Sequence, residues 1–181
     1  MNRHRIFIAI NLPDNTKKNL ARYKERWSEI PAKWVKENNI HLTLEFLGYI
    51  SDQEVLDIIN ITKDAVAKCS QFSITLNKVS YGPDDKVPPK MIWVSGEVSE
   101  DLNSLKQKLD RALGIIETRK FTPHITLARI KKWDWQRKDP EEREDINEDI
   151  NLNFDVNSIE VMESVLRRGG PEYTILESIE L

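Results

Sequence analysis

A four-residue phrase of histidine, an apolar residue, threonine and leucine occurs twice in this chain, at residues 41–44 and 124–127. The two copies use two of the three histidines and lie in opposite halves of the 181 residues. In a β-strand, residues i and i+2 point to the same face of the sheet. Each copy therefore directs its histidine and threonine to one face and its two apolar residues to the other. Two such strands facing each other would gather two imidazoles and two hydroxyls around one pocket.

Composition and length are those of a single folded domain. The chain has 39% hydrophobic and 31% charged residues, a balance typical of globular proteins. We therefore expect residues 1–181 to form one domain, large enough for two small lobes around a shared core. The net charge of −3 argues against a broad basic surface for nucleic acid, but it leaves room for a pocket that takes one phosphate at an RNA end.

Three features of the sequence favour a cytoplasmic protein. No stretch of about 18 apolar residues predicts a membrane span. The short apolar run at residues 6–10 lacks the length and the cleavage site of a signal peptide. The single cysteine, Cys69, has no partner for an internal disulfide, and we interpret it as core filler. We also expect a monomer that does not bind membranes.

Hydrophobic periodicity predicts a mixed chain with more strands than helices. Gly48 is expected to end the first motif strand, and residues 167–171, which contain two glycines, to form a hairpin turn. Residues 81–90 are expected to form a loop, and the polar stretch 131–149 a loop or a short exposed helix. Ser51 with Glu54 three residues later is a capping-box signature and predicts a helix start at residue 51. Helices are expected at residues 13–28, 51–68 and 99–113, a brief extended piece at 34–35, and strands at 5–11, 40–47, 72–79, 91–98, 121–130, 152–156, 158–166 and 173–180.

This order of elements predicts an α+β fold. Several strands are joined by hairpin-length loops, so the sheets are expected to be largely antiparallel. Because each half carries one His-x-Thr strand, we expect two pseudo-symmetric lobes that form a central cleft, with the helices on the outside. Apart from the motif itself, the two halves are too dissimilar in sequence to establish a repeat.

The residue types of the motif suit proton transfer at a phosphate. Imidazole titrates at about pH 6.5, so one histidine can hold a proton while the other lacks it. Two such groups on opposite sides of a phosphorus atom form a general acid and a general base, each worth about 10²–10⁴-fold in rate. The threonine hydroxyls can donate hydrogen bonds to phosphate oxygens as negative charge develops on them.

A metal site is the competing interpretation of the two histidines. Zinc requires three or four ligands from histidine, cysteine and carboxylate side chains. The sequence has no His-x-His, no HExxH and no cysteine pair, and no carboxylate lies in step with the two His-x-Thr strands. We therefore expect no metal and no cofactor. The sequence also lacks a Gly-rich phosphate loop and a G-x-S-x-G nucleophile elbow.

The sequence around both motifs, residues 41–48 and 122–129, strongly resembles the paired HxTx signatures of the 2H phosphoesterase superfamily. The resemblance is closest to its RNA 2′,3′-cyclic phosphodiesterase branch, also called the 2′-5′ RNA ligase family. It covers nearly the whole chain, because further segments also resemble that family: residues 5–10, 33–35, 91–94 and 163–173.

The resemblance implies hydrolysis of a 2′,3′-cyclic phosphate at an RNA end to a 2′-phosphomonoester. His41 is then the proton donor to the departing 3′-oxygen, and His124 is the proton acceptor that activates water. Composition and spacing do not distinguish the two histidines, so the reverse assignment stays open. Thr43 and Thr126 are implied to bind the phosphate oxygens. The implied partners are RNA 3′ ends or nucleotides with a 2′,3′-cyclic phosphate.

Four further residues are candidates for substrate contact. Arg129 follows His124 by five residues, and this odd offset puts it on the opposite face of a regular strand. The resemblance favours a role for Arg129 at the site, with a structural role as the alternative. Trp34, Phe46 and Tyr173 are candidates for stacking on the terminal base, with a place in the core as the alternative.

Two other functions fit the same residues. The acid–base pair also suits reversible 2′-5′ joining of RNA halves, by microscopic reversibility. A non-catalytic module that binds RNA ends or nucleotides is the alternative from a different class, although both histidines and both threonines of the motifs are intact. The third histidine, His4, lies near the N-terminus and is assigned no role.

Overall fold

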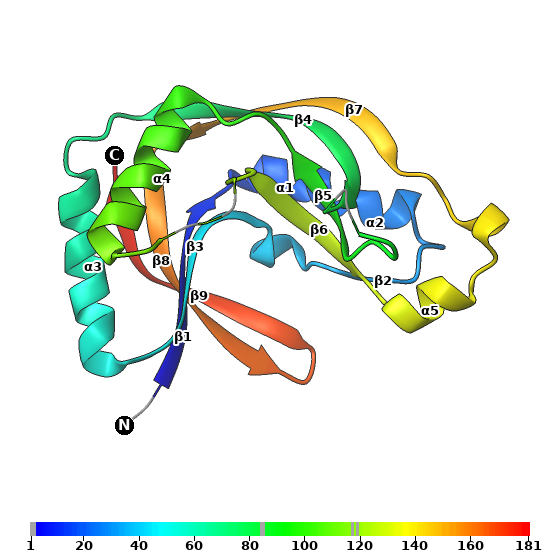
Figure 1. Ribbon diagram of the computed structural model, residues 1–181, viewed down its shortest axis with the longest axis horizontal. Coiled ribbons are helices and arrows are strands. Elements are labelled where there is room, and N and C mark those ends of the chain that lie inside the picture. The colour runs from blue at the N-terminus through cyan, green and yellow to red at the C-terminus, as the bar shows by residue number, and fades with distance from the viewer. Residues whose placement is uncertain (1–2, 84–85, 117, 119) are drawn as a thin grey trace.

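Figure 1 shows the computed structural model of the chain, which describes residues 3–83, 86–116, 118 and 120–181. Strands dominate, and most of the helices connect one strand to the next. The elements in chain order are β1 (Arg3–Asn11), α1 (Asp14–Ala21), α2 (Tyr23–Arg26), β2 (Ala32–Trp34), the 3-10 helix η1 (Glu37–Asn39), β3 (His41–Ser51), α3 (Asp52–Val66), β4 (Phe72–Gly82), β5 (Met91–Ser95), α4 (Glu100–Leu113), β6 (His124–Ile130), α5 (Lys132–Arg137), the 3-10 helix η2 (Pro140–Glu142), β7 (Asn147–Val156), β8 (Ser158–Arg167) and β9 (Gly170–Glu180).

The described strands form one nine-stranded sheet in which every paired neighbour is antiparallel. The order is β7-β4-β5-β6-β3-β1-β8-β9, and β2 pairs with β6 off this path. The two motif strands, β3 and β6, therefore lie at the centre of the order. Among the described residues, β3 and β6 pair at one position, where Leu42 lies opposite Ile125. The predicted α+β fold with antiparallel strands is confirmed, and its two halves are joined at this central pair.

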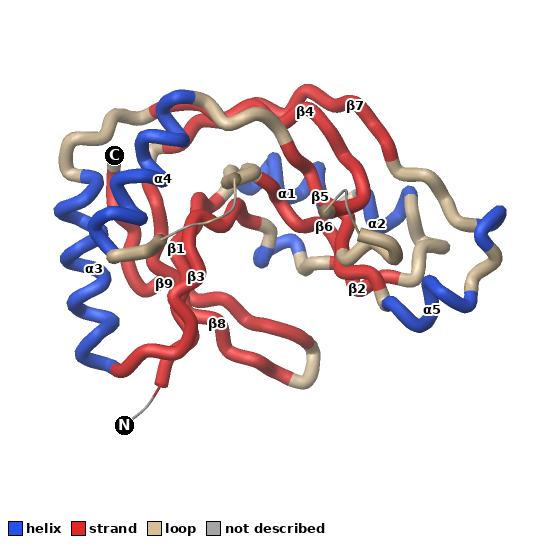
Figure 2. The backbone as a smooth tube through the Cα atoms, in the orientation of Figure 1, coloured by secondary structure: helices blue, strands red, loops and turns tan. Residues whose placement is uncertain are grey.

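The sheet spreads into two lobes on either side of the central pair (Figure 1). One lobe contains β1, β3, β8 and β9, and the other contains β2 and β4 to β7. Figure 2 shows α3 and α4 on the outside of the first lobe, where they pack against each other, and α5 at the far end of the second. α1 packs against η1, which leads directly into the first motif strand. In the part of the chain that is described, no helix has the length and apolar character needed to cross a membrane.

The apolar residues of both motifs face the core, as the alternation predicts. Leu42 and Ile125 are fully buried, and Leu44 and Leu127 are at most 4% exposed. These side chains belong to one contiguous hydrophobic cluster that also includes Leu20 of α1 and the buried leucines of α4. Burial of one face of each motif strand holds the other face, with the histidines and threonines, toward the space between the lobes.

The first motif strand does not end at Gly48, and this prediction is wrong. β3 continues to Ser51, because Gly48 adopts a left-handed conformation with φ of +78° that glycine accepts without strain. Its pairing with β1 shifts at this point, so that Gly48 pairs with Ile6 while Phe46 pairs with Phe7. The glycine therefore accommodates a bulge inside a longer strand.

Several other boundaries differ from the predictions. The first helix is divided at Arg22 into α1 and α2. β5 and β6 are shorter than expected, while β4 extends to Gly82 into the predicted loop 81–90, of which residues 84–85 lie outside the described part. The polar stretch 131–149 holds α5, in which Trp135 is buried, then η2 and the first residues of β7. The polar residues at the start of β7 form a strand because their backbone groups pair with β4, and periodicity alone does not reveal this pairing.

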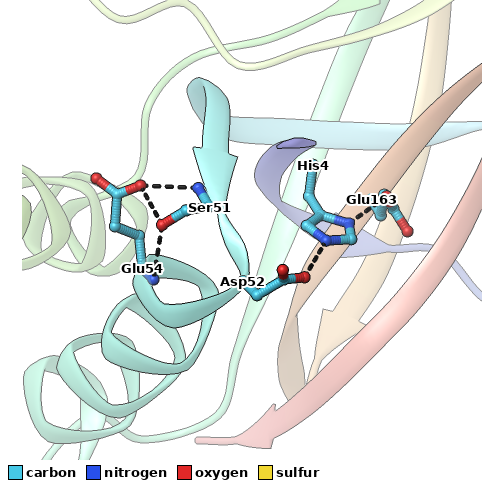
Figure 3. Close-up of polar contacts among 5 residues, drawn as sticks. All are labelled: His4, Ser51, Asp52, Glu54 and Glu163. Atoms are coloured by element: carbon cyan, nitrogen blue, oxygen red, sulfur yellow. Dashed lines mark hydrogen bonds and ion pairs between the residues drawn. The ribbon is translucent and has the colours of Figure 1, made fainter. Parts of the chain in front are cut away.

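His4, which the sequence left without a role, joins three elements at the N-terminal end of β1 (Figure 3). Its Nδ1 lies 2.7 Å from the carboxylate of Glu163 on β8, and its Nε2 lies 2.7 Å from that of Asp52 on α3. The hydrogen bonds to Glu163 and then to Asp52 raise the pKa of His4 above its usual value. The same view shows the predicted capping box of α3, in which the Ser51 hydroxyl accepts from the Glu54 backbone and the Glu54 carboxylate accepts from the Ser51 backbone.

Candidate active site

A cavity of about 310 Å³ lies where the two motif strands meet. It is lined by both motif histidines and both motif threonines. The other four candidates named from the sequence, which are Trp34, Phe46, Arg129 and Tyr173, line the same cavity. The structure therefore brings all eight predicted residues together from β2, β3, β6 and β9. Their roles in binding and catalysis remain predictions.

The antiparallel register of the motif strands determines how the four motif side chains are arranged. Leu42 pairs with Ile125, and both side chains point into the core. One residue further in each direction, this register sets His41 opposite Thr126 and Thr43 opposite His124 on the cavity face. Each imidazole thus has a hydroxyl both on its own strand and on the neighbouring one. An anion bound between the strands would have an imidazole and a hydroxyl on each side.

Both histidines are oriented by the same backbone contact. The Nδ1 of His41 lies 2.7 Å from the carbonyl oxygen of Asn39, and the Nδ1 of His124 lies 2.9 Å from that of Thr122. Because a carbonyl oxygen only accepts hydrogen bonds, Nδ1 must carry the hydrogen in each ring. The neutral imidazole then has its lone pair on Nε2. In His41 this nitrogen accepts a hydrogen bond of 2.9 Å from the Thr43 hydroxyl.

Aromatic rings surround both imidazoles. The ring centroid of His41 lies 5.1 Å from that of Phe7 and 5.2 Å from that of Tyr173. The ring centroid of His124 lies 4.8 Å from that of Trp93 on β5. These contacts limit the rotation of each imidazole and keep water away from it. Phe7 lies on β1, which pairs with the first motif strand, and Trp93 lies on β5, which pairs with the second. Neither residue was identified from the sequence.

Burial lowers the pKa of both histidines. For His41, burial is the largest cause, and nearby positive charge, Lys17 first, lowers the pKa further. For His124, burial is again the largest cause, and Arg129 adds to it. The hydrogen bond from each Nδ1 to a carbonyl opposes the shift without cancelling it. Both imidazoles are therefore mainly neutral at pH 7 in the free protein, since both pKa values lie below the usual 6.5.

A bulge at the same motif position interrupts both strands. In β3, the pairing with β1 skips Leu44, and in β6, the pairing with β5 skips Leu127. Each is the leucine that ends the motif. An extra residue in one strand reverses the alternation of faces beyond it. The pseudo-symmetry of the two motifs therefore extends to the backbone, since both strands carry a bulge at the same motif position.

The bulges decide which residues after the motifs reach the cavity. Arg129 lines the cavity together with His124, so the prediction that it lies on the opposite face is wrong. That prediction assumed a regular strand. Because the pairing with β5 skips Leu127, the alternation of faces reverses there, and Arg129 points to the same face as His124 although it follows by five residues. Phe46 follows His41 by the same offset beyond the other bulge and lines the cavity as well. Arg129 and Phe46 therefore occupy equivalent positions in the two lobes.

Two charged residues of the cavity lining, Lys33 and Lys36, were not identified from the sequence. They flank Trp34 and Val35 in the segment 33–36, whose repeated lysines were a signal that sequence analysis could have used. Phe46 is 66% exposed and Tyr173 is half-buried, so both rings have surface available to a ligand. Among the described residues, no group of three or more histidine, cysteine, aspartate or glutamate side chains is placed to hold a metal ion.

Comparison with known proteins supports the two-lobe interpretation. The family described as LigT like Phosphoesterase matches the chain twice, at residues 10–93 and 92–173, so that each match contains one motif. A protein of Thermotoga maritima named RNA 2′,3′-cyclic phosphodiesterase is 31% identical over 180 residues, which cover 95% of this chain and 92% of that protein. A protein of Aquifex aeolicus with the same name is 33% identical over 173 residues, covering 87% and 86%.

Solved structures show the same fold over the whole chain. The crystal structure of TT0787 of Thermus thermophilus matches with a TM-score of 0.81 and 26% identity, covering 98% of this chain and 97% of that one. Escherichia coli LigT complexed with phosphate matches with a TM-score of 0.80 over 100% of this chain and 99% of that one, a likeness of fold at 21% identity. With both family matches spanning the motifs, the chain belongs to the LigT-like phosphoesterase family.

Proposed function

We propose that this protein hydrolyses 2′,3′-cyclic phosphate ends of RNA to 2′-phosphomonoesters, with His41 and His124 as general acid and general base. The observation that carries the proposal is the antiparallel pairing of the motif strands, which brings two imidazoles with matching Nδ1 anchors to one cavity. The names of relatives that cover nearly the whole chain support the same reaction.

In the proposed reaction, the Nε2 of His124 takes a proton from water as the water oxygen attacks phosphorus. The bond between phosphorus and the 3′-oxygen breaks, and Nε2 of His41 donates a proton to that oxygen. The products are a 2′-phosphomonoester and a free 3′-hydroxyl. Thr43 and Thr126 donate hydrogen bonds to the two non-bridging oxygens, which carry increasing negative charge in the transition state. Arg129 supplies a positive charge on the same face.

The general acid must gain its proton when the substrate binds. Both histidines are mainly neutral in the free protein, because burial lowers both pKa values. A bound cyclic phosphate carries a negative charge, which favours a protonated imidazole beside it and raises its pKa. Once Nε2 of His41 is protonated, it cannot accept from Thr43, so that hydroxyl becomes free to donate to the phosphate. Substrate binding thus prepares both groups together.

The pH dependence of kcat/KM should be bell-shaped, with its maximum on the acidic side of pH 6.5. The reaction needs one proton on the pair of imidazoles, taken up from solution as substrate binds if the free enzyme lacks it, and kcat/KM reports the pKa values of the free enzyme. The maximum lies midway between those two pKa values, and both are lowered from 6.5. Initial rates at low substrate concentration across pH 4.5–9, in buffers of constant ionic strength, measure the profile. A maximum above pH 7 would contradict the burial-induced shifts.

The identity of the product tests the proposed function directly. The protein is incubated with chelator and a nucleotide or short RNA that ends in a 2′,3′-cyclic phosphate, and the products are identified by ³¹P NMR. We expect the 2′-phosphate as the sole product and a rate that chelator does not change. A 3′-phosphate product, or binding without turnover, would refute the proposal. A parallel sample with a 5′-hydroxyl strand detects 2′-5′ joining as a longer product.

A further inference from the structure

Three cations that line the cavity have no partner of opposite charge among the described residues. No ion pair there is formed by Lys33, Lys36 or Arg129, although all three border the space that contains the histidines. Lys33 on β2 pairs directly with Arg129 on β6, so two positive side chains stand side by side on one face of the sheet. Like charges in this position destabilise a sheet unless an anion lies between or beside them.

The two lysines extend to the hairpin of the other lobe. A Cβ atom at Gly170 would lie 3.2 Å from the Nζ of Lys33, and one at Gly169 would lie 3.8 Å from the Nζ of Lys36. Gly170 has φ of +117°, which excludes most other residues from this turn between β8 and β9. The glycines therefore leave space for both ammonium groups beside the hairpin backbone. Because the lysines come from the segment 33–36 of the second lobe, their side chains bridge the two lobes beside the cavity.

The number of cations exceeds the charge of the reacting group. A 2′,3′-cyclic phosphate carries one negative charge. Arg129 lies on the same strand and the same face as His124 and Thr126, so the proposed function assigns its charge to that phosphate. Lys33 is one strand further from the motif, and Lys36 lies beyond the end of that strand. No motif histidine or threonine comes from that segment, so the lysines suit a phosphate that does not react. An RNA strand supplies one such charge for every further nucleotide.

The aromatic residues of the first lobe complement this charge. Phe46 and Tyr173 line the cavity from β3 and β9, whereas the lysines line it from the second lobe. Single-stranded RNA is commonly held with its bases on aromatic side chains and its backbone along a positive groove. The cavity combines these features, with Phe46 and Tyr173 on the first lobe and the two lysines beside Trp34 on the second.

We propose that Lys33 and Lys36 form a second phosphate site, which binds the phosphodiester on the 5′ side of the terminal nucleotide and makes the enzyme prefer RNA strands to cyclic mononucleotides. This inference rests on the proposed function and adds to it the part of the substrate beyond the reacting end. The base of the terminal nucleotide then lies toward Phe46 and Tyr173, and the strand continues past the β8–β9 hairpin.

The test compares two substrates that share one reacting end: a 2′,3′-cyclic mononucleotide, and a short RNA that ends in the same nucleotide. The wild-type protein should have the higher kcat/KM on the strand. Lys33→Ala/Lys36→Ala should lower kcat/KM on the strand about tenfold or more, mainly through KM, because hydrogen bonds between charged groups are removed. It should change kcat/KM on the mononucleotide by less than about twofold. The dependence of strand binding on salt should weaken by a slope of about 0.7 for each phosphate that the variant no longer neutralises.

The matched control is Lys24→Ala/Lys68→Ala, which removes the same charge from exposed lysines that do not line the cavity. It should leave the preference for the strand intact, and Lys33→Arg/Lys36→Arg should keep most of it. Equal losses on both substrates, or none on the strand, would overturn the inference. Calorimetry makes the same comparison without turnover, by measuring the affinity of each variant for the 2′-phosphate product of the mononucleotide and for that of the RNA strand. Turnover of the mononucleotide with no preference for the strand would refute this inference alone, whereas no turnover of either substrate would refute the proposed function.

Discussion

Replacing His41 or His124 with alanine should each lower kcat on a 2′,3′-cyclic nucleotide by about 10²–10⁴-fold. Each substitution removes the only Nε2 that its strand presents to the phosphate, while the buried leucine or isoleucine beside it keeps the strand in place. Because the two groups act in one transition state, the double variant should lose much less than the product of the two single losses. Steady-state rates with equal folded protein, checked by circular dichroism, measure the effect.

The third histidine provides the matched control for this experiment. His4→Ala removes an imidazole that contacts Asp52 and Glu163 and does not line the cavity, so kcat should stay within about twofold of the wild-type value. If the His41 or His124 variant kept its full rate, the proposed function would be wrong.

The pH profiles of the same variants separate the two roles. Loss of the general acid should abolish the decline in rate as pH rises, and loss of the general base should abolish the decline as pH falls. The proposal expects the first behaviour for His41→Ala and the second for His124→Ala. The opposite result would reverse the assignment without affecting the reaction.

Lys106→Met should destabilise the protein by about 3 kcal/mol. The side chain of Lys106 on α4 is 5% exposed and forms ion pairs with Glu45, which is 7% exposed, and with Asp110 at 2.6 Å. Removal of the lysine leaves the buried Glu45 carboxylate beside that of Asp110 without a cation, and Glu45 must then take up a proton. Burial already raises the pKa of Glu45 to about 7, which shows how costly its charge is in this position.

Urea unfolding at pH 7 measures the predicted loss, with Arg111→Met as the control. Arg111 lies on the same helix, is exposed, and should contribute less than about 1 kcal/mol. The difference between Lys106→Met and the wild type should shrink toward pH 4.5, because Glu45, once protonated, no longer needs the ammonium group. An equal stability of Lys106→Met and the control would contradict the prediction. Since Glu45 directly precedes Phe46, this ion pair also supports the bulged part of β3 beside the cavity.

Local patterns in the sequence sufficed for the elements that depend on local physics. The alternation of the motifs predicted two strands with buried leucines, and Ser51 with Glu54 predicted the start of α3. Side-chain burial with a period of two and a capping box are both properties of a few neighbouring residues. Where pairing with a distant strand decided the outcome, the predictions failed. Gly48 continues its strand, and β7 begins inside the stretch 131–149, which was predicted to be a loop or a short exposed helix.

The sequence by itself determined that two histidines and two threonines face one side of their strands, that Leu42 and Ile125 face the other, and that the chemistry of these groups suits a phosphate. Only the tertiary structure decided that the two strands pair with each other, so that the four groups meet in one cavity. It also decided that Arg129 and Phe46 reach that cavity and that Lys33 and Lys36, at its border, extend to the β8–β9 hairpin. The physical reason is that bulges and register arise from hydrogen bonds to strands far away in the chain, whereas alternation of faces arises within each strand.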